Sequence, residues 1–395
     1  MEHFSIVLGL CRSAVQSPNP ALRGHVVRLQ KALKKSGANE EADAVEKVLN
    51  AAESSVELAP SRVVLSRAAL SGESLTPSVS PPVDKETGAP LAEIVLPTSG
   101  GAPAPLFNSS LGAAVDSLLE EWRHVDQLKS AGVRPALSTL LFGAPGTGKT
   151  MLAHYIAAQL GLPLIVARLD GLVSSFLGTT ARNISTLFAF ANRYRCVLLL
   201  DEFDAVAKLR DDPHELGEIK RVVNTLLQCI DGRADVGFTL AITNHESLLD
   251  PAVWRRFDVR IEVPKPELLT RTRILQGQFQ GDSYDEAHFK LLAWLTHDGS
   301  GSDIGKLADF LKRQRAIRKD HFSFLEAVRS YVQLSASDDQ SKRKVLVVGE
   351  QENLARALAA DREAPFNQEQ LAGLFGCTQP TISRWLKKEK AMQVE

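Results

Sequence analysis

The stretch that decides the fold is GAPGTGKT at residues 143–150. Its glycines let the backbone bend so closely that N–H groups face phosphate oxygens, while Lys149 reaches the β- and γ-phosphates and Thr150 the Mg²⁺. STLLF at 138–142 predicts a buried strand entering the loop, and KTMLAHYIAAQL at 149–160 predicts a helix whose positive N-terminal end lies beneath the phosphates. The stretch predicts a nucleoside triphosphate site formed by Gly143, Pro145, Gly146, Thr147, Gly148, Lys149, Thr150 and Met151.

A second motif, VLLLDEFD at 197–204, completes the predicted site. Its four apolar residues predict a central strand that delivers Asp201 and Glu202 to its carboxyl end, where ligands bind in open α/β sheets. We expect Asp201, together with Thr150, to hold the metal and Glu202 to polarise the attacking water. Each motif alone also has a structural interpretation, but their order and context favour a complete site for ATP and Mg²⁺.

The composition bounds the class of protein. With 395 residues there is room for two or three domains, and a net charge of −1 gives no global basic field that would attract nucleic acid. The four cysteines form no CxxC pair, which argues against a zinc site and a disulfide framework and fits a reducing cytosol. No apolar run approaches the roughly 20 residues that span a bilayer, and FSIVLGL at 4–10 makes a poor signal peptide. We therefore expect a cytoplasmic protein without membrane contact.

The order of elements predicts an α/β fold, a parallel sheet flanked by helices. Strands are expected at 163–168, 237–244 and 259–264, and helices at 181–194 and 217–232. We divide the chain into an N-terminal helical bundle at 1–70, a Pro/Gly/Ser-rich linker at 71–108, a large α/β domain at 109–264, a helical lid at 265–335, a linker with a helix at 336–364 and a helix-turn-helix at 365–395. Within the first linker, LAEIVLP at 91–97 is compatible with a short strand.

This succession of motifs resembles the AAA+ P-loop ATPases, in particular the group with katanin, spastin and the membrane-bound bacterial AAA proteases. The resemblance covers about residues 109–334. It implies that Asn244 is the sensor residue that touches the γ-phosphate and the attacking water. Within DPAVWRRFDVRIEVPKPE at 250–267, it implies that Arg255 and Arg256 are arginine fingers for a neighbouring subunit, and hence a homo-oligomeric, hexameric ring.

The same resemblance extends to the lid and to a pore. GSGSDIGKL at 299–307 is similar to the lid segment beside the adenine, which implies that Gly301 and Ser302 bind nucleotide. The chain departs from other AAA+ groups in having no obvious lid arginine there, and from its own group in reading GAPGTGKT in place of GPPGTGKT. Phe176 and Leu177, within DGLVSSFLGTTARNISTLF at 170–188, match the aromatic and hydrophobic positions of the family's pore loop. We expect this segment, with Thr179 and Thr180, to be a polar surface loop; the alternative is that Phe176 is an ordinary buried aromatic.

The C-terminal residues have the helix-turn-helix pattern in QEQLAGLFGCTQPTISRWLK at 368–387. Gly376 makes the turn, and Ile382 and Trp385 form the inward side of the second helix. The residues expected to point outward and to contact DNA are Gln379, Thr381, Ser383, Arg384, Lys387 and Lys388. Because the same unit also serves protein contacts, the pattern leaves both DNA and protein as partners.

Two functions remain open at this point. The first is an ATP-driven hexameric unfoldase that threads polypeptide past Phe176. No HExxH motif occurs, so any proteolysis needs a separate protease partner. The overall plan loosely resembles bacterial AAA ATPases encoded beside subtilisin-like proteases in anti-phage loci. The second is a DNA-associated ATPase switch that uses the helix-turn-helix to control a transcription, replication or transposition complex. Phe176 favours the first function, and the C-terminal module favours the second.

Overall fold

The structure is a computed structural model that describes residues 4, 7–8, 11, 20–38, 41–48, 72–97, 104–168, 177–204, 216–281, 284–335 and 342–392. The chain divides into two compact units, Met1–Leu70 and Ser71–Glu395. Within the described ranges, no helix has the length and apolar character needed to cross a membrane.

The described residues of the first unit are mainly helical. It contains α2 (Pro20–Lys35) and a second helical segment at 41–48. Lys34 and Glu46 join the two segments by an ion pair of 2.7 Å, and the lysines in the last turn of α2 favour its negative C-terminal end. The small apolar core of the unit contains Cys11, Val26, Leu33, Ala42 and Val45.

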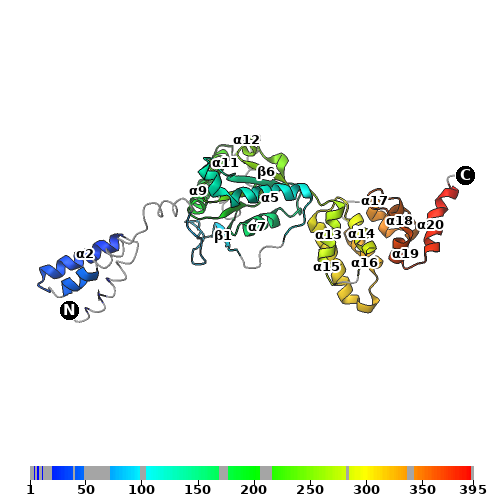
Figure 1. The fold of residues 1–395 in the computed structure, drawn as a ribbon, viewed down its shortest axis with the longest axis horizontal. Helices are drawn as coiled ribbons and strands as arrows, with labels where there is room; N and C mark the ends of the chain where they lie inside the picture. Colours follow the sequence, from blue (N-terminus) through cyan, green and yellow to red (C-terminus); the bar gives the residue numbers. More distant parts are fainter. Residues whose placement is uncertain are drawn as a thin grey trace. The chain divides into compact units, whose positions relative to one another are not determined.

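The second unit contains a six-stranded sheet in the order β1-β3-β4-β5-β2-β6 (Figure 1). Its strands are β1 (Ala92–Val95), β2 (Ser138–Phe142), β3 (Leu164–Ala167), β4 (Val197–Leu200), β5 (Phe238–Thr243) and β6 (Val259–Glu262). Neighbouring strands are parallel, except that β1 pairs antiparallel with β3. The central strands β4 and β5 are buried throughout, which explains why β4 is a continuous apolar run and why β5 has no charged residue.

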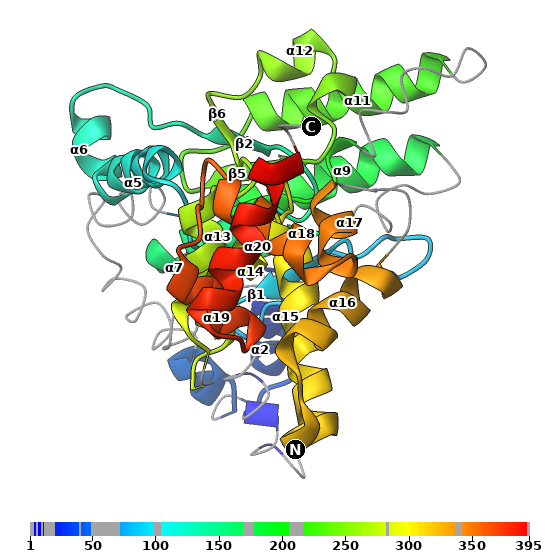
Figure 2. The same ribbon diagram turned by 90° about the vertical axis from the view of Figure 1, so that its right-hand side faces the viewer.

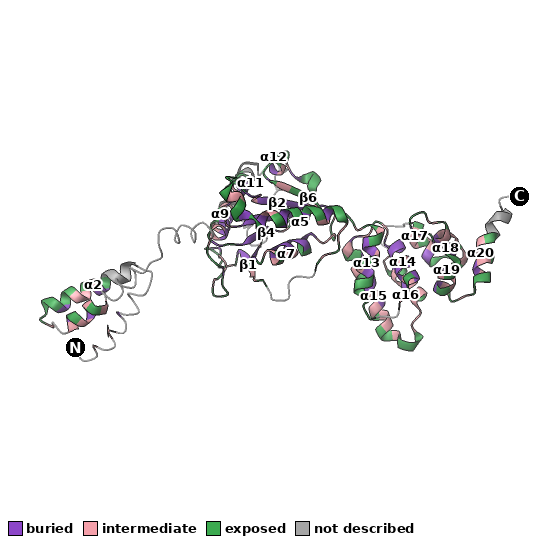
Figure 3. Cartoon of the chain, viewed as in Figure 1, coloured by how far each residue is buried: buried purple, intermediate pink, exposed green. Residues whose placement is uncertain are grey.

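Helices cover both faces of the sheet, and the buried residues lie between the layers (Figure 3). Successive side chains of a strand point to opposite faces, so Leu199 of β4 packs with one helical layer while Leu198 and Leu200 pack with the other. One layer contains α5 (Ser109–Arg123) and α7 (Lys149–Gln159), and the other contains α9 (Leu177–Arg193) and α11 (Leu216–Asp231). The predicted P-loop α/β fold is confirmed, with a sheet that is mostly rather than wholly parallel.

The expected linker at 71–108 is wrong for residues 72–97. Leu75 and Leu91 are buried in the core of the sheet, and the short strand anticipated at 91–97 is present as the edge strand β1. The polar and Pro-rich stretches of this segment form its turns. Its few apolar residues pack against the core of the sheet. At the end of the range, the Asn108 side chain accepts from the N–H of Leu111 at 2.9 Å and caps α5.

The lid and the C-terminal helices share one hydrophobic core. Leu311 of the lid belongs to the same buried cluster as Leu354 and Leu371 of the tail, by which we mean residues 342–392. Helices of the lid and tail lie side by side in Figure 2. The described part of 336–364, where we expected a linker with a helix, contains two helices, and both pack against the lid. The lid helices are α13 (Leu268–Gln278), α14 (Glu286–Leu295), α15 (Gly301–Arg318) and α16 (Phe324–Leu334), followed by α17 (Lys342–Val348), α18 (Gln351–Ala360), α19 (Gln368–Phe375) and α20 (Gln379–Met392).

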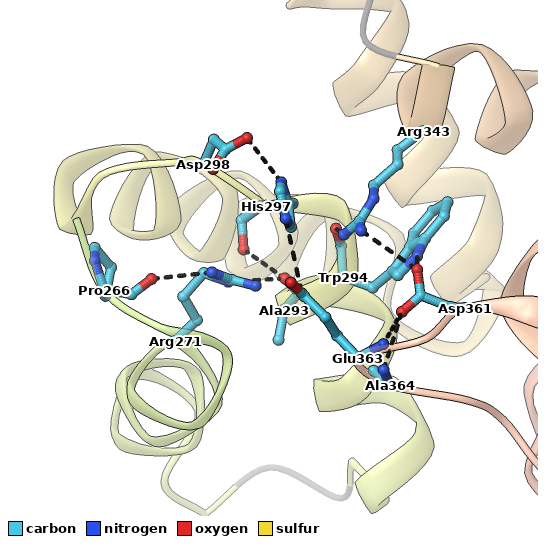
Figure 4. A network of polar contacts seen from close by, with 11 residues as sticks. Pro266, Arg271, Ala293, Trp294, His297, Asp298, Arg343, Asp361, Glu363 and Ala364 are labelled. Carbon is cyan, nitrogen blue, oxygen red and sulfur yellow. Dashed lines mark hydrogen bonds and ion pairs between the residues drawn. The ribbon is translucent and has the colours of Figure 1, made fainter. Parts of the chain in front are cut away.

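A polar network reinforces this junction (Figure 4). The indole N–H of Trp294 in α14 donates to the carboxylate of Asp361 at 2.7 Å, and Arg343 donates to the Trp294 carbonyl at 2.8 Å. Arg343 also contacts Asp361 at 3.3 Å and lies 5.0 Å from the Trp294 ring centre. Burial opposes ionisation of Asp361, yet hydrogen bonds from Ala364 and Trp294 and the charge of Arg343 hold its pKa below the usual range. The tail is thus attached to the lid by charge as well as by apolar contact.

Candidate nucleotide site

The glycine-rich loop between β2 and α7 is held against the rest of the site so tightly that side chains are excluded. A Cβ on Gly143 would lie 2.5 Å from the carbonyl oxygen of Val263, and φ there is +134°. A Cβ on Gly146 would lie 2.6 Å from the hydroxyl oxygen of Ser300, the residue that caps the N-terminus of α15 in the lid. The loop therefore needs glycine at both positions, for conformation and for space.

Lys149 lies at the centre of this loop. Its side chain is buried, and Nζ donates to the carbonyl oxygens of Gly143 at 2.8 Å and Ala144 at 2.7 Å. Burial lowers the pKa of Lys149, while the nearby carboxylates of Asp201 and two other residues oppose that shift. An ammonium held in this way, at the N-terminus of α7, offers positive charge where a bound phosphate would lie.

Thr150 and Asp201 meet beside the loop. The Thr150 hydroxyl donates to Oδ2 of Asp201 at 2.9 Å, which joins the start of α7 to the carboxyl end of β4. A hydroxyl and a carboxylate are the hard oxygen ligands that Mg²⁺ prefers, and both side chains are accessible enough to accept the ion. The residues present therefore fit the predicted metal.

Glu202 has an unusual backbone. Its φ is +53°, a conformation that is rare for residues other than glycine, and its N–H donates to Oδ1 of Asp201 at 2.8 Å. Strained residues persist where the surrounding structure holds them, and they cluster at functional sites. Here the turn directs the chain away from β4 and leaves the Glu202 side chain exposed beside Asp201.

Asn244 follows β5, which lies between β4 and β2 in the sheet. Because these strands are parallel, Asn244 ends on the same edge as the glycine-rich loop and Asp201. Sequence reasoning missed a buried hydrogen bond next to Asn244, between Thr243 and Asp204. Thr243 donates to the carboxylate of Asp204 at 3.2 Å, and the N–H of His245 donates to the Thr243 hydroxyl at 3.0 Å. Asp204, the acidic residue that ends DEFD, was the feature of the sequence that could have indicated this interaction.

The structure also brings the lid to the loop. The N–H of Ser302 donates to the carbonyl oxygen of Gly146 at 3.0 Å, and Gly301 lines an adjacent pocket. Thr147 lies in the same pocket. The remaining lining residues, which sequence reasoning did not identify, come from the entry to α5 and the start of α13, and include Leu106, Phe107, Asn108, Leu111, Thr270 and Ile274. The first four lie in or next to the segment at 71–108 that we interpreted as a linker. The Pro- and Gly-rich composition of that segment gave no indication that they line a pocket.

Other predicted site residues lie on the surface. Pro145 and Met151 are exposed, as are Arg255 and Arg256 at the end of α12 (Pro251–Trp254). Arg256 forms an ion pair with Asp231, the last residue of α11 in the same chain. The two arginines are therefore placed on an accessible surface, and one of them has an intramolecular partner.

The segment expected to face a pore is described only in part. Phe176 lies outside the described residues, and Leu177 is described as the first residue of α9 without its side chain. Thr179 and Thr180 belong to α9 and are 7% and 1% exposed, so the expectation that they form a polar surface loop is wrong. They pack because α9 begins earlier than the periodicity at 181–194 indicated.

The C-terminal module has the geometry of two helices around a tight turn. Gly376 ends α19 with φ of +64°, Ile382 is buried, and the rings of Phe375 and Trp385 lie 5.7 Å apart, edge to face. Among the residues expected to point outward, Gln379, Arg384 and Lys387 are exposed, Thr381 and Ser383 are partly buried, and the side chain of Lys388 lies outside the described atoms.

Comparison with known proteins agrees with this geometry. Residues 139–265 match the ATPase family associated with various cellular activities (AAA). The AAA domain of FIGL-1, crystallised in complex with ADP, superposes with a TM-score of 0.50 and 22% identity over 65% of this chain and 91% of that one. Residues 139–265 therefore form an AAA ATPase domain, as the sequence predicted.

Particular relatives align with less than half of this chain. The AAA family ATPase y4kL of Sinorhizobium fredii is 45% identical over 163 residues, which are 41% of this chain and 49% of that protein. Proteasome-activating nucleotidase 2 of Haloferax volcanii is 38% identical over 202 residues, 49% of this chain and 48% of the relative. The chain thus spans about half the length of these relatives.

Proposed function

We propose that this protein is an ATP-hydrolysing, hexameric unfoldase that threads polypeptide through a central pore. The observation that carries the proposal is the junction of Lys149, Thr150 and Asp201 at the carboxyl edge of the sheet, with the lid in direct contact with the glycine-rich loop. A lid that touches the loop can change position when a nucleotide enters between them. Such a change is what converts hydrolysis into movement.

Each residue of the site has a separate task in the proposed reaction. Lys149 binds the β- and γ-phosphates, and Thr150 and Asp201 hold the Mg²⁺, which when bound neutralises charge on the phosphates. Glu202 orients the attacking water and accepts its proton. Asn244, at the end of β5, contacts the water or the γ-phosphate from the neighbouring strand.

Arg255 and Arg256 are proposed to act on the site of an adjacent subunit. Both are exposed, so their guanidinium groups are accessible to another chain. The ion pair of Arg256 with Asp231 is half-exposed and therefore weak enough to be exchanged for a phosphate contact. Since each site then needs a finger from its neighbour, hydrolysis requires the ring.

Phe176 and Leu177 are proposed to grip the polypeptide substrate. A relative that aligns with 49% of this chain is named a proteasome-activating nucleotidase, which supports work on polypeptide delivered to a separate protease. We extend the proposal to a separate protease partner in anti-phage defence, on the resemblance in domain plan alone. In this scheme the protein acts in the cytoplasm without membrane contact.

The proposal is tested by separating binding from hydrolysis. We expect Lys149→Ala to abolish nucleotide binding and Glu202→Gln to bind ATP while hydrolysing it very slowly, because phosphate binding and water activation use different residues. Fluorescent-nucleotide titration and phosphate release measure the two properties. Phe176→Ala should keep basal ATPase yet fail to unfold a destabilised fluorescent protein with an unstructured tail. Equal loss of binding in both site variants, or full unfolding by Phe176→Ala, would refute the corresponding assignment.

A second candidate function, a DNA-associated ATPase switch, is favoured by one observation. The exposed residues Gln379, Arg384 and Lys387 lie on α20, the second helix of the module. In helix-turn-helix proteins that helix enters the major groove. Arg384→Ala with Lys387→Ala should weaken duplex binding and flatten its salt dependence, with unfolding activity unchanged. Fluorescence anisotropy at several salt concentrations measures both. Duplex binding equal to wild type would make the module a protein-interaction unit.

A further inference from the structure

The segment that precedes the AAA domain runs along most of α9. At the C-terminal end of this helix, Glu73 forms an ion pair with Arg193 at 2.8 Å and backbone hydrogen bonds with Arg193 and Arg195, each 3.0 Å long. At the N-terminal end, Asp84 and Glu86 contact the first turns. The helix has 17 residues, so these anchors, at 179–183 and at 193, are separated by most of its length.

The N-terminal anchor is buried and specific. The Asn183 amide donates to Asp84 at 2.9 Å, and the two residues are 3% and 2% exposed. Glu86 accepts from the Thr179 hydroxyl at 3.3 Å and lies 3.7 Å from the Arg182 guanidinium. The hydrogen bond from Asn183, with others from the backbone, lowers the pKa of Asp84, so the carboxylate is ionised at neutral pH.

The same segment holds the other side of the connection between β3 and α9. The N–H of Arg168, the first residue after β3, donates to the carbonyl oxygen of Leu91 at 2.9 Å, and Ala92 pairs with Ala167 in the sheet. Arg168 also lies 3.9 Å from the carboxylate of Glu93. Both ends of the connection between β3 and α9, residues 168–176, are therefore attached to one stretch of chain.

Backbone hydrogen bonds join the two ends of this stretch to each other, so that it forms a closed loop. Val83 and Pro90 form an antiparallel bridge, and the N–H of Asp84 donates to the carbonyl oxygen of Ala89 at 2.8 Å. The N–H of Leu91 donates to the carbonyl oxygen of Pro82 at 2.8 Å. A closed loop transmits displacement from one anchor to the other better than an open one, because its two arms cannot separate freely.

We propose that residues 83–93 form a brace that fixes both ends of the connection between β3 and α9, residues 168–176. Asp84 and Asn183 are its positioning residues. The position of the brace does not depend on the proposed function. Its consequence rests on the proposed function, because the connection at 168–176 contains Phe176, the residue proposed to grip substrate.

A test compares the two ends of α9 in the full-length protein. Asp84→Ala removes the buried acceptor of Asn183, whereas the matched control Glu73→Ala removes an exposed ion pair at the far end. We expect amide hydrogen exchange at 179–183 to rise about tenfold in Asp84→Ala, because a buried hydrogen bond to a charged group is lost. In Glu73→Ala the exchange at 179–183 should stay at the wild-type rate. Basal ATPase should be unchanged in both variants.

The functional arm uses ATP-dependent loss of fluorescence from a destabilised fluorescent protein with an unstructured tail. Asp84→Ala should unfold it at least about fivefold more slowly than Glu73→Ala, since misplaced gripping residues waste ATP. Asp84→Asn keeps the size and turn of the side chain and should show a smaller effect in the same direction, which provides a variant if Asp84→Ala fails to fold.

The outcomes separate the brace from the pore. Unchanged exchange at 179–183 in both Asp84 variants overturns the brace. Faster exchange with wild-type unfolding overturns its coupling to the gripping residues. If Phe176→Ala unfolds the same substrate as well as wild type, the proposed pore fails, and the exchange measurement still decides whether residues 83–93 hold the two ends.

Discussion

The shared core of lid and tail predicts that Leu371→Ala will destabilise both. Leu371 lies on α19, is fully buried, and belongs to the same cluster as Leu311 of the lid. Replacing such a leucine by alanine costs about 3 kcal/mol in transfer and cavity energy. Since domains of this size are stabilised by only about 5–15 kcal/mol in total, the loss is a large part of the whole.

The assay is thermal unfolding combined with hydrogen exchange. At roughly 4 °C for each kcal/mol, we expect the unfolding midpoint of the lid and tail to fall by about 12 °C. Amides of α14 and α15 should lose protection together with those of α19 and α20. Leu334→Ala is the matched control, because that leucine on α16 is 77% exposed and its loss should change stability by less than about 0.5 kcal/mol. Wild-type protection of α14 and α15 beside an unprotected α19 would show that the tail folds as a separate domain and would refute the reasoning.

Two further predictions concern the nucleotide site. Gly146→Ala places a Cβ 2.6 Å from the Ser300 hydroxyl at a φ of +76°, so it should push the lid from the loop and weaken binding of a fluorescent ATP analogue at least about tenfold, whereas Gly305→Ala, with no atom within 4 Å, should bind normally. Arg256→Ala should lower ATPase turnover with little change in ATP affinity, and mixing it with Lys149→Ala subunits should restore part of the activity, as competent sites then meet competent fingers. Absence of recovery in rings verified as mixed by native mass spectrometry would indicate that the arginine acts within its own subunit.

The sequence alone determined the chemistry of the AAA domain. GAPGTGKT and VLLLDEFD specify it because phosphate binding demands glycine, lysine and a hydroxyl in one short stretch, and a buried parallel strand demands continuous apolar residues. These requirements are local, so they appear in the order of residues. The relation of Lys149, Thr150 and Asp201 followed from the rule that parallel strands present their carboxyl ends on one edge.

Only the tertiary structure decided which segments belong to which core. Residues 72–97 have the composition of a linker, yet Leu75 and Leu91 are buried in the core of the sheet and Asp84 accepts a buried hydrogen bond from α9. Strand β1 is also stabilised by backbone hydrogen bonds, which do not depend on a particular side chain. The helices after residue 341 join the lid for a similar reason. Burial of Leu354 and Leu371 depends on partners far along the chain. The pKa of Asp361, which is partly buried, is held below its usual range in part by the contacts of Trp294 and Arg343. Such long-range contacts leave no period or motif in the sequence, because each depends on how separate elements pack.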